Sequence, residues 1–174
     1  MSMEICVLSD VRLASIAEWQ TAIETESFPL RLPREKSLAE SGGGNLRAQL
    51  RDKETMIEYS VVDFSELKQT YRNVNFGREW RYVIAFIWSS DFDEELAAWM
   101  AATAYARASG GIVFDEQEGK LLTPEESIQV TREIERRQPQ LKALLQAYFQ
   151  ELSANSPEAT EALREFMQRR SIKS

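Results

Sequence analysis

The chain has 174 residues, with 21 Lys and Arg, 28 Asp and Glu, one cysteine and no histidine. A chain of this length normally folds as one domain, and its 43% hydrophobic and 28% charged residues are typical of a globular protein. Without histidine, the chain has no Ser-His-Asp triad, no Cys-His pair and no histidine ligand for zinc. The single Cys6 excludes an intrachain disulfide and a multi-cysteine metal site.

The first elements are predicted to be a strand and a helix. Residues 3–8 form an apolar run, which predicts a strand buried on both faces. Ser15 and Glu18 have capping-box spacing, and apolar residues follow at helical spacing until Pro29 ends the pattern. The start of the chain lacks the basic region of a signal peptide, and no apolar run is long enough to span a membrane. We therefore expect a cytoplasmic protein.

The middle of the chain is predicted to supply three strands and a short helix. Residues 33–44 contain three consecutive glycines, which predict a flexible loop or a hairpin entry, because no Lys-Ser/Thr follows them as in a phosphate-binding loop. Residues 45–50 and 55–64 have the pattern of two strands, and Ser65 can cap the short helix that follows. Residues 81–89 are apolar on both faces, which predicts a central strand.

A helix and a hairpin are predicted next. Asp91 or Asp93 caps the helix, and the Ser-Gly-Gly run at 109–111 ends it with a glycine in the left-handed conformation. Residues 112–115 and 120–122 then have the pattern of two strands joined by a tight turn.

The C-terminal part is predicted to be helical. Thr-Pro-Glu-Glu at 123–126 is a strong helix-start signal, and Pro139 breaks or kinks the helix. An apolar stripe follows, which we expect to pack on its own domain, and a last helix is predicted from Ser156. The stripe consists of Leu141, Leu144, Leu145, Tyr148, Phe149 and Leu152.

The order of these elements predicts an α+β fold, with an antiparallel or mixed central sheet, helices packed on one side and a helical C-terminal extension. We expect a single domain over residues 1–174, with an α+β core at 1–123 and C-terminal helices at 124–174.

One segment carries the whole charge imbalance. Residues 91–126 contain nine acidic and two basic residues and therefore have a net charge of −7, which is also the net charge of the whole chain. The remaining residues are neutral overall. Such a field repels phosphate and attracts a basic partner, although helix starts and turns are also commonly acidic. The predicted partner-binding residues are Asp91, Asp93, Glu94, Glu95, Asp115, Glu116 and Glu118.

Catalytic and metal-binding motifs are weak. The pairs Asp91/Asp93 and Asp115/Glu118 offer oxygen ligands for Mg²⁺ or Ca²⁺, but they lack the glycine and the remote glutamate of an EF-hand. Cys6 lies in an apolar run and is expected to be a buried structural cysteine. A pI near 4.9 opposes nucleic-acid binding. We therefore expect no catalytic residue, cofactor-binding residue or metal ligand.

The stretch from Trp99 to Gly119, with its alanine-rich helix, Gly-Gly pair and strand ending in Asp115, resembles small bacterial immunity-type proteins of polymorphic and type VI secretion toxin systems. The segment at 5–10 and the helix around Trp19 fit the same pattern. The resemblance implies a cytoplasmic protein that neutralises one toxin by binding it and has no activity of its own.

These observations predict a non-catalytic immunity or inhibitor protein. Its partner would be a cognate protein toxin, and a basic, nuclease-like effector would suit the acidic segment. We expect no nucleic acid or membrane partner. A homodimer is a further possibility that the sequence does not decide. Trp80, Phe92 and Phe114 are candidate aromatic anchors, although burial in the core is the commoner role of such residues. The alternatives are a carboxylate-dependent, Mg²⁺-assisted enzyme, and an oligomeric scaffold that uses the apolar stripe.

Overall fold

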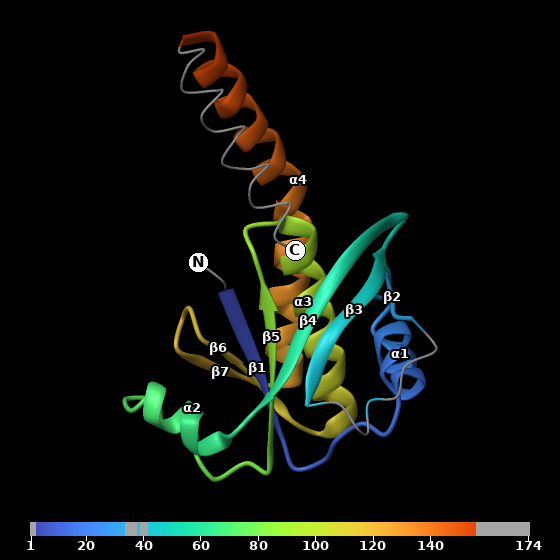
Figure 1. Ribbon diagram of the computed structural model, residues 1–174, viewed down its shortest axis with the longest axis vertical. Coiled ribbons are helices and arrows are strands. Elements are labelled where there is room, and N and C mark those ends of the chain that lie inside the picture. The colour runs from blue at the N-terminus through green and yellow to red at the C-terminus, as the bar shows by residue number, and fades with distance from the viewer. Residues whose placement is uncertain (1–2, 34–37, 39–41, 156–174) are drawn as a thin grey trace. The chain divides into compact units, whose positions relative to one another are not determined.

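The computed structural model describes residues 3–33, 38 and 42–155 (Figure 1). The chain divides into two compact units, Met1–Ile134 and Glu135–Ser174. The boundary between these units falls inside the last described helix. The helix predicted from Ser156 lies outside the described residues.

Within the described part of the chain, seven strands form one sheet in the order β2-β3-β4-β5-β1-β6-β7, and every neighbouring pair is antiparallel. This arrangement, with its helices, confirms the predicted α+β class. The strands are β1 (Met3–Ser9), β2 (Leu30–Arg31), β3 (Gly43–Leu50), β4 (Lys53–Val62), β5 (Tyr82–Trp88), β6 (Ile112–Asp115) and β7 (Lys120–Leu122).

The larger core lies on the face of the sheet covered by α1 (Ile16–Thr25) and α3 (Phe92–Ser109). Trp19 is its centre: the ring is fully buried, and its Nε1–H donates to the Ala101 carbonyl oxygen at 2.9 Å. The ring also makes edge contacts with Tyr59, Phe86 and Tyr105. The alanines of α3 keep this helix thin, so it approaches the sheet closely and is buried nearly all round.

A smaller core lies on the opposite face, under α2 (Phe64–Thr70). Because side chains alternate along a strand, Ile5 and Val7 of β1 enter the larger core, whereas Cys6 and Leu8 face α2. Leu67 of α2 packs in this second cluster. No pattern in the sequence indicated that one helix covers the second face.

Local signals placed most helix ends correctly. Ser15 and Glu18 form the predicted capping box, Asp91 caps α3, and Gly110 ends it at φ 65°. The prediction that Ser65 caps α2 was wrong, because the cap is Asp63, whose carboxylate accepts a hydrogen bond from the Ser65 N–H.

The remaining differences concern β2, β3 and the last helix. The two-residue strand β2 was not predicted, and two glycines expected in a loop, Gly43 and Gly44, begin β3. The last described helix, α4 (Pro124–Asn155), continues through Pro139 instead of breaking there. Its start has the predicted reciprocal bonds between Thr123 and Glu126. No helix in the described residues is long and apolar enough to cross a membrane.

Candidate functional site

The predicted acidic residues lie at one end of the sheet, here called the acidic end: residues 91–95, which open α3, and residues 115–118, which close β6 and turn into β7. Two backbone pairings fix this placement. Met3 pairs with Trp88, and Ile5 pairs with Asp115. The end of β5 and the end of β6 are therefore on the same side, separated only by β1. Two strand spacings correspond to about 10 Å.

Several acids of this end also stabilise the local backbone. The Asp91 carboxylate accepts the backbone N–H groups of Asp93 and Glu94. Glu94 accepts from both the backbone and the hydroxyl of Ser89. Asp115 accepts two backbone N–H groups of the turn that follows it. Capping and turn formation therefore explain part of the acidity, as the alternative interpretation of the sequence anticipated.

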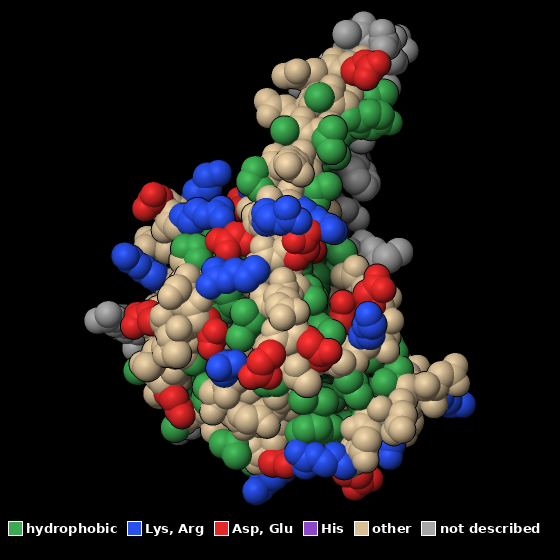
Figure 2. Space-filling model, turned by 180° about the vertical axis from the view of Figure 1, so that it is seen from behind, with side chains coloured by type: hydrophobic (Ala, Val, Ile, Leu, Met, Phe, Trp, Pro, Cys, Tyr) green, Lys and Arg blue, Asp and Glu red, His purple; other side chains and the backbone are tan. Residues whose placement is uncertain are grey.

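Five carboxylates of the acidic end are nevertheless not neutralised by ion pairs within the described part of the chain. Among the described residues, no Lys or Arg forms a salt bridge with Asp91, Glu94, Glu95, Asp115 or Glu118. Asp93, Glu94 and Glu95 are partly exposed, Glu118 is exposed, and burial raises the pKa of Glu95. In contrast, acidic and basic side chains are interspersed on the face of the first unit seen in Figure 2.

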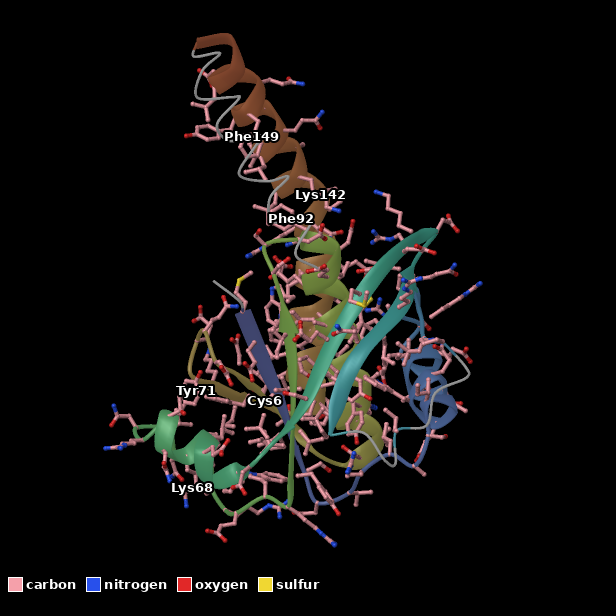
Figure 3. All side chains as sticks on the ribbon, in the orientation of Figure 1. Cys6, Lys68, Tyr71, Phe92, Lys142 and Phe149 are labelled. Atoms are coloured by element: carbon pink, nitrogen blue, oxygen red, sulfur yellow. The ribbon has the colours of Figure 1, made fainter. Side chains whose placement is uncertain are left out.

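Glu116 differs from the other acids of this end, because its side chain turns toward Cys6 and Tyr71 on the α2 side of the sheet. The Cys6 thiol donates to Glu116 Oε1 at 3.2 Å, and the Tyr71 hydroxyl donates to Glu116 Oε2 at 2.5 Å. Glu4, two residues before Cys6 on the same face of β1, approaches the same sulfur: its Oε1 lies 3.8 Å from Cys6 Sγ. Figure 3 shows Cys6 on β1 and Tyr71 just beyond α2.

We call these three residues the Glu4–Cys6–Glu116 cluster. One ligand atom from each lies within 4.8 Å of the others, and among the described residues this is the only group of three or more such side chains. Cys6 is fully buried, and both glutamates are partly buried. The cluster joins residues 110 positions apart in sequence, which explains why the sequence did not indicate it.

The surroundings favour the protonated forms of Glu4, Cys6 and Tyr71. Burial, followed by repulsion from Glu116, raises the pKa of Glu4. The pKa of the Cys6 thiol is raised well above its usual value by burial and by the same carboxylates. Burial and the bond to Glu116 likewise raise the pKa of Tyr71. Neither glutamate has a salt bridge with Lys or Arg in the described residues.

Packed aromatic side chains lie beside the cluster. The Tyr71 ring makes an edge contact with Phe114, at 5.0 Å between centroids, and Phe114 makes another with Phe76 at 5.1 Å. Phe114 is fully buried, so it cannot be an anchor for a partner as the sequence suggested. The two other candidate anchors, Trp80 and Phe92, are partly exposed.

The acid pairs that suggested an enzyme do not line either of two large grooves. One groove of about 690 Å³ is lined by residues of α1, β2, β3 and β4. The other, of about 910 Å³, is bordered by Lys68, Arg72, Trp80 and Arg81 near α2. Neither includes Asp91, Asp93, Asp115 or Glu118.

Within the second unit, part of the predicted apolar stripe is exposed. The exposed side chains are Leu141 (46%), Leu144 (67%), Leu145 (43%) and Tyr148 (57%). The expectation that the stripe packs on its own domain stays a prediction.

No protein-family model, curated protein or solved structure matches this chain.

Proposed function

We propose that this protein works by binding another protein, as a non-catalytic inhibitor of the immunity type in the bacterial cytoplasm. The observation that carries the proposal is the acidic end, where two segments that are separated in sequence bring carboxylates together. Within the described residues, Asp91, Glu94, Asp115 and Glu118 of these segments form no salt bridge with Lys or Arg. An uncompensated field of this kind attracts a protein with a basic groove, such as an enzyme that handles phosphate-bearing substrates.

Several carboxylates of the acidic end are also held in fixed positions, which suits a binding surface. Asp91, Glu94 and Asp115 are held by hydrogen bonds to the backbone or to Ser89. Carboxylates fixed in this way lose little side-chain entropy when a partner binds. The segments that carry them are attached to α3, which packs on the sheet, and to β6 and β7, which belong to the sheet. The surface is therefore preorganised.

Steering by such a field acts mainly on the association rate. Charge complementarity can raise association rate constants from about 10⁵–10⁶ M⁻¹s⁻¹ to about 10⁸ M⁻¹s⁻¹ at low salt. Salt screens this attraction, because the Debye length is about 8 Å at physiological ionic strength.

The experiment uses the full chain and the product of the adjacent gene, expressed separately. Calorimetry or co-purification should show a one-to-one complex. The double variant Glu94→Gln/Glu118→Gln should bind more slowly. The matched control is Glu66→Gln/Glu79→Gln, which removes one acid from the first turn of another helix and one from a loop.

A complex that forms equally fast with wild type and both double variants would contradict the role of the acidic end. If the adjacent product does not bind at all, the inhibitor hypothesis fails for that partner, and growth protection against it should also be absent.

A further inference from the structure

We propose that the Glu4–Cys6–Glu116 cluster is a binding site for a single divalent zinc-type cation. This inference is independent of the proposed inhibitor function, because it concerns the α2 side of the sheet and not the exposed carboxylates of the acidic end.

The first argument is the spacing of the donor atoms. Zinc binds thiolate sulfur at about 2.3 Å and carboxylate oxygen at about 2.0–2.2 Å, so two ligands at a tetrahedral angle lie about 3.3–3.8 Å apart. The Cys6 sulfur lies 3.2 Å from Glu116 Oε1 and 3.8 Å from Glu4 Oε1. All three donor atoms lie within 4.8 Å of one another, so side-chain adjustments of less than about 1 Å bring them around one ion.

The second argument is charge. Glu4 of β1 and Glu116, which directly follows β6, approach the same sulfur, and like charges so close across neighbouring strands destabilise a sheet. Among the described residues, neither carboxylate has an ion pair with Lys or Arg. The two ionised carboxylates carry a charge of −2 beside the neutral thiol, and a divalent cation bound to both of them and to the Cys6 thiolate lowers this to −1 while bonding directly to each carboxylate.

The third argument is the support around the donors. Tyr71 donates its hydroxyl proton to Glu116 Oε2, which leaves Oε1 directed at the sulfur. Hydrogen bonds of this kind orient metal-ligating carboxylates. The contacts of Tyr71 with Phe114, and of Phe114 with Phe76, place apolar rings beside the site, and such a shell limits access of water.

The donor set selects the class of ion. One thiolate with two carboxylates suits zinc, which accepts both sulfur and oxygen, better than Mg²⁺ or Ca²⁺, which take oxygen ligands. Three protein ligands leave a fourth position for water. Binding replaces the proton of the Cys6 thiol, which is released to solvent, together with any proton held by Glu4; no electron transfer is involved.

The chain is well suited to a direct test, because it contains no histidine and only one cysteine. Co²⁺ is used as a spectroscopic probe for Zn²⁺ with the tag-free, full-length protein. A thiolate-to-cobalt charge-transfer band in the near ultraviolet can then arise only from Cys6. We expect this band at one equivalent of Co²⁺ and its loss when Zn²⁺ is added.

Three variants separate this site from nonspecific binding by surface acids. Cys6→Ser should abolish the band and weaken Zn²⁺ binding by about 100-fold or more, and Tyr71→Phe should weaken it about 10-fold by releasing Glu116. Glu118→Gln, in the same turn but exposed, should leave both signals unchanged. Far-ultraviolet circular dichroism checks that each variant is folded.

The proposal is overturned if the wild type shows no charge-transfer band, or if Cys6→Ser binds Zn²⁺ as tightly as the wild type. It is also overturned if Glu118→Gln weakens binding as much as Tyr71→Phe does, since the ion would then be held by surface acids. If Cys6→Ser fails to fold, Glu4→Gln decides the matter: the site requires a loss of affinity, and unchanged affinity contradicts it.

Discussion

Replacing Glu4 by Gln should stabilise the metal-free protein at neutral pH. The side chain keeps its size and its place beside Cys6, but the repulsion between Glu4 and Glu116 is removed. Like charges at close cross-strand positions destabilise by about 0.2–1 kcal/mol. For a domain of this size, about 1 kcal/mol corresponds to a rise of roughly 2–5 °C in Tm.

The stabilisation by Glu4→Gln should depend on pH. The pKa of Glu4 is raised in the folded protein, mainly by burial, so the native state binds this proton more tightly than the unfolded chain does. The stability from this group is fully present below the unfolded pKa of about 4.3 and is lost as pH rises through the folded pKa. The advantage of Glu4→Gln should therefore be present at pH 7 and smaller at pH 4.

The assay is urea unfolding of wild type, Glu4→Gln and the control Glu118→Gln, at both pH values and with a chelator present. With Zn²⁺ in excess, the order should reverse, because the variant has lost a ligand and gains less from binding. A Glu4→Gln variant that is less stable than wild type at pH 7 without metal would refute this account of the cluster.

Five other substitutions, at four positions, test the fold. Trp19→Leu should lower the free energy of unfolding, measured with urea, by about 3 kcal/mol, because it removes buried ring contacts and the hydrogen bond to the Ala101 carbonyl. A loss below about 1 kcal/mol would contradict the central role of this ring. Gly110→Ala should lower the free energy of unfolding by about 1 kcal/mol, through the positive φ of this residue alone. Gly111→Ala should lower it more, because the added Cβ would lie 2.4 Å from the Leu8 carbonyl oxygen. The reverse order of Tm values would refute the packing argument. Asp91→Ala should remove the α3 cap and lower stability by about 0.5–2 kcal/mol, and Asp91→Ser should recover most of the loss; equal stability of the two variants would count against capping.

Elements encoded by local signals could be predicted from the sequence. The hairpin at Ile112–Asp115 and Lys120–Leu122 was predicted at its observed bounds, because two short apolar runs flank a turn that ends in Gly119. The start of α4 followed from the cap and proline at 123–126. In each case the stabilising contacts lie within a few residues of one another.

Features that depend on distant parts of the chain could not be predicted. The strand β2 has two residues and is defined by its pairing with Leu50 and Gln49, which no local pattern announces. Glu4 merely interrupts an apolar run in sequence, and its meeting with Glu116 depends on the register between β1 and β6. The sequence did indicate the excess of acid, but only the strand pairing reveals that its two halves share one end of the sheet.

The most direct test of the binding proposal is the salt dependence of the association rate. Stopped-flow mixing with the product of the adjacent gene would be measured from about 20 mM to 500 mM salt, where the Debye length falls from roughly 20 Å to about 4 Å. We predict a rate constant that falls steeply with salt for wild type and for Glu66→Gln/Glu79→Gln, and a clearly shallower dependence for Glu94→Gln/Glu118→Gln. Equal slopes for all three proteins would contradict the claim that the acidic end receives the partner.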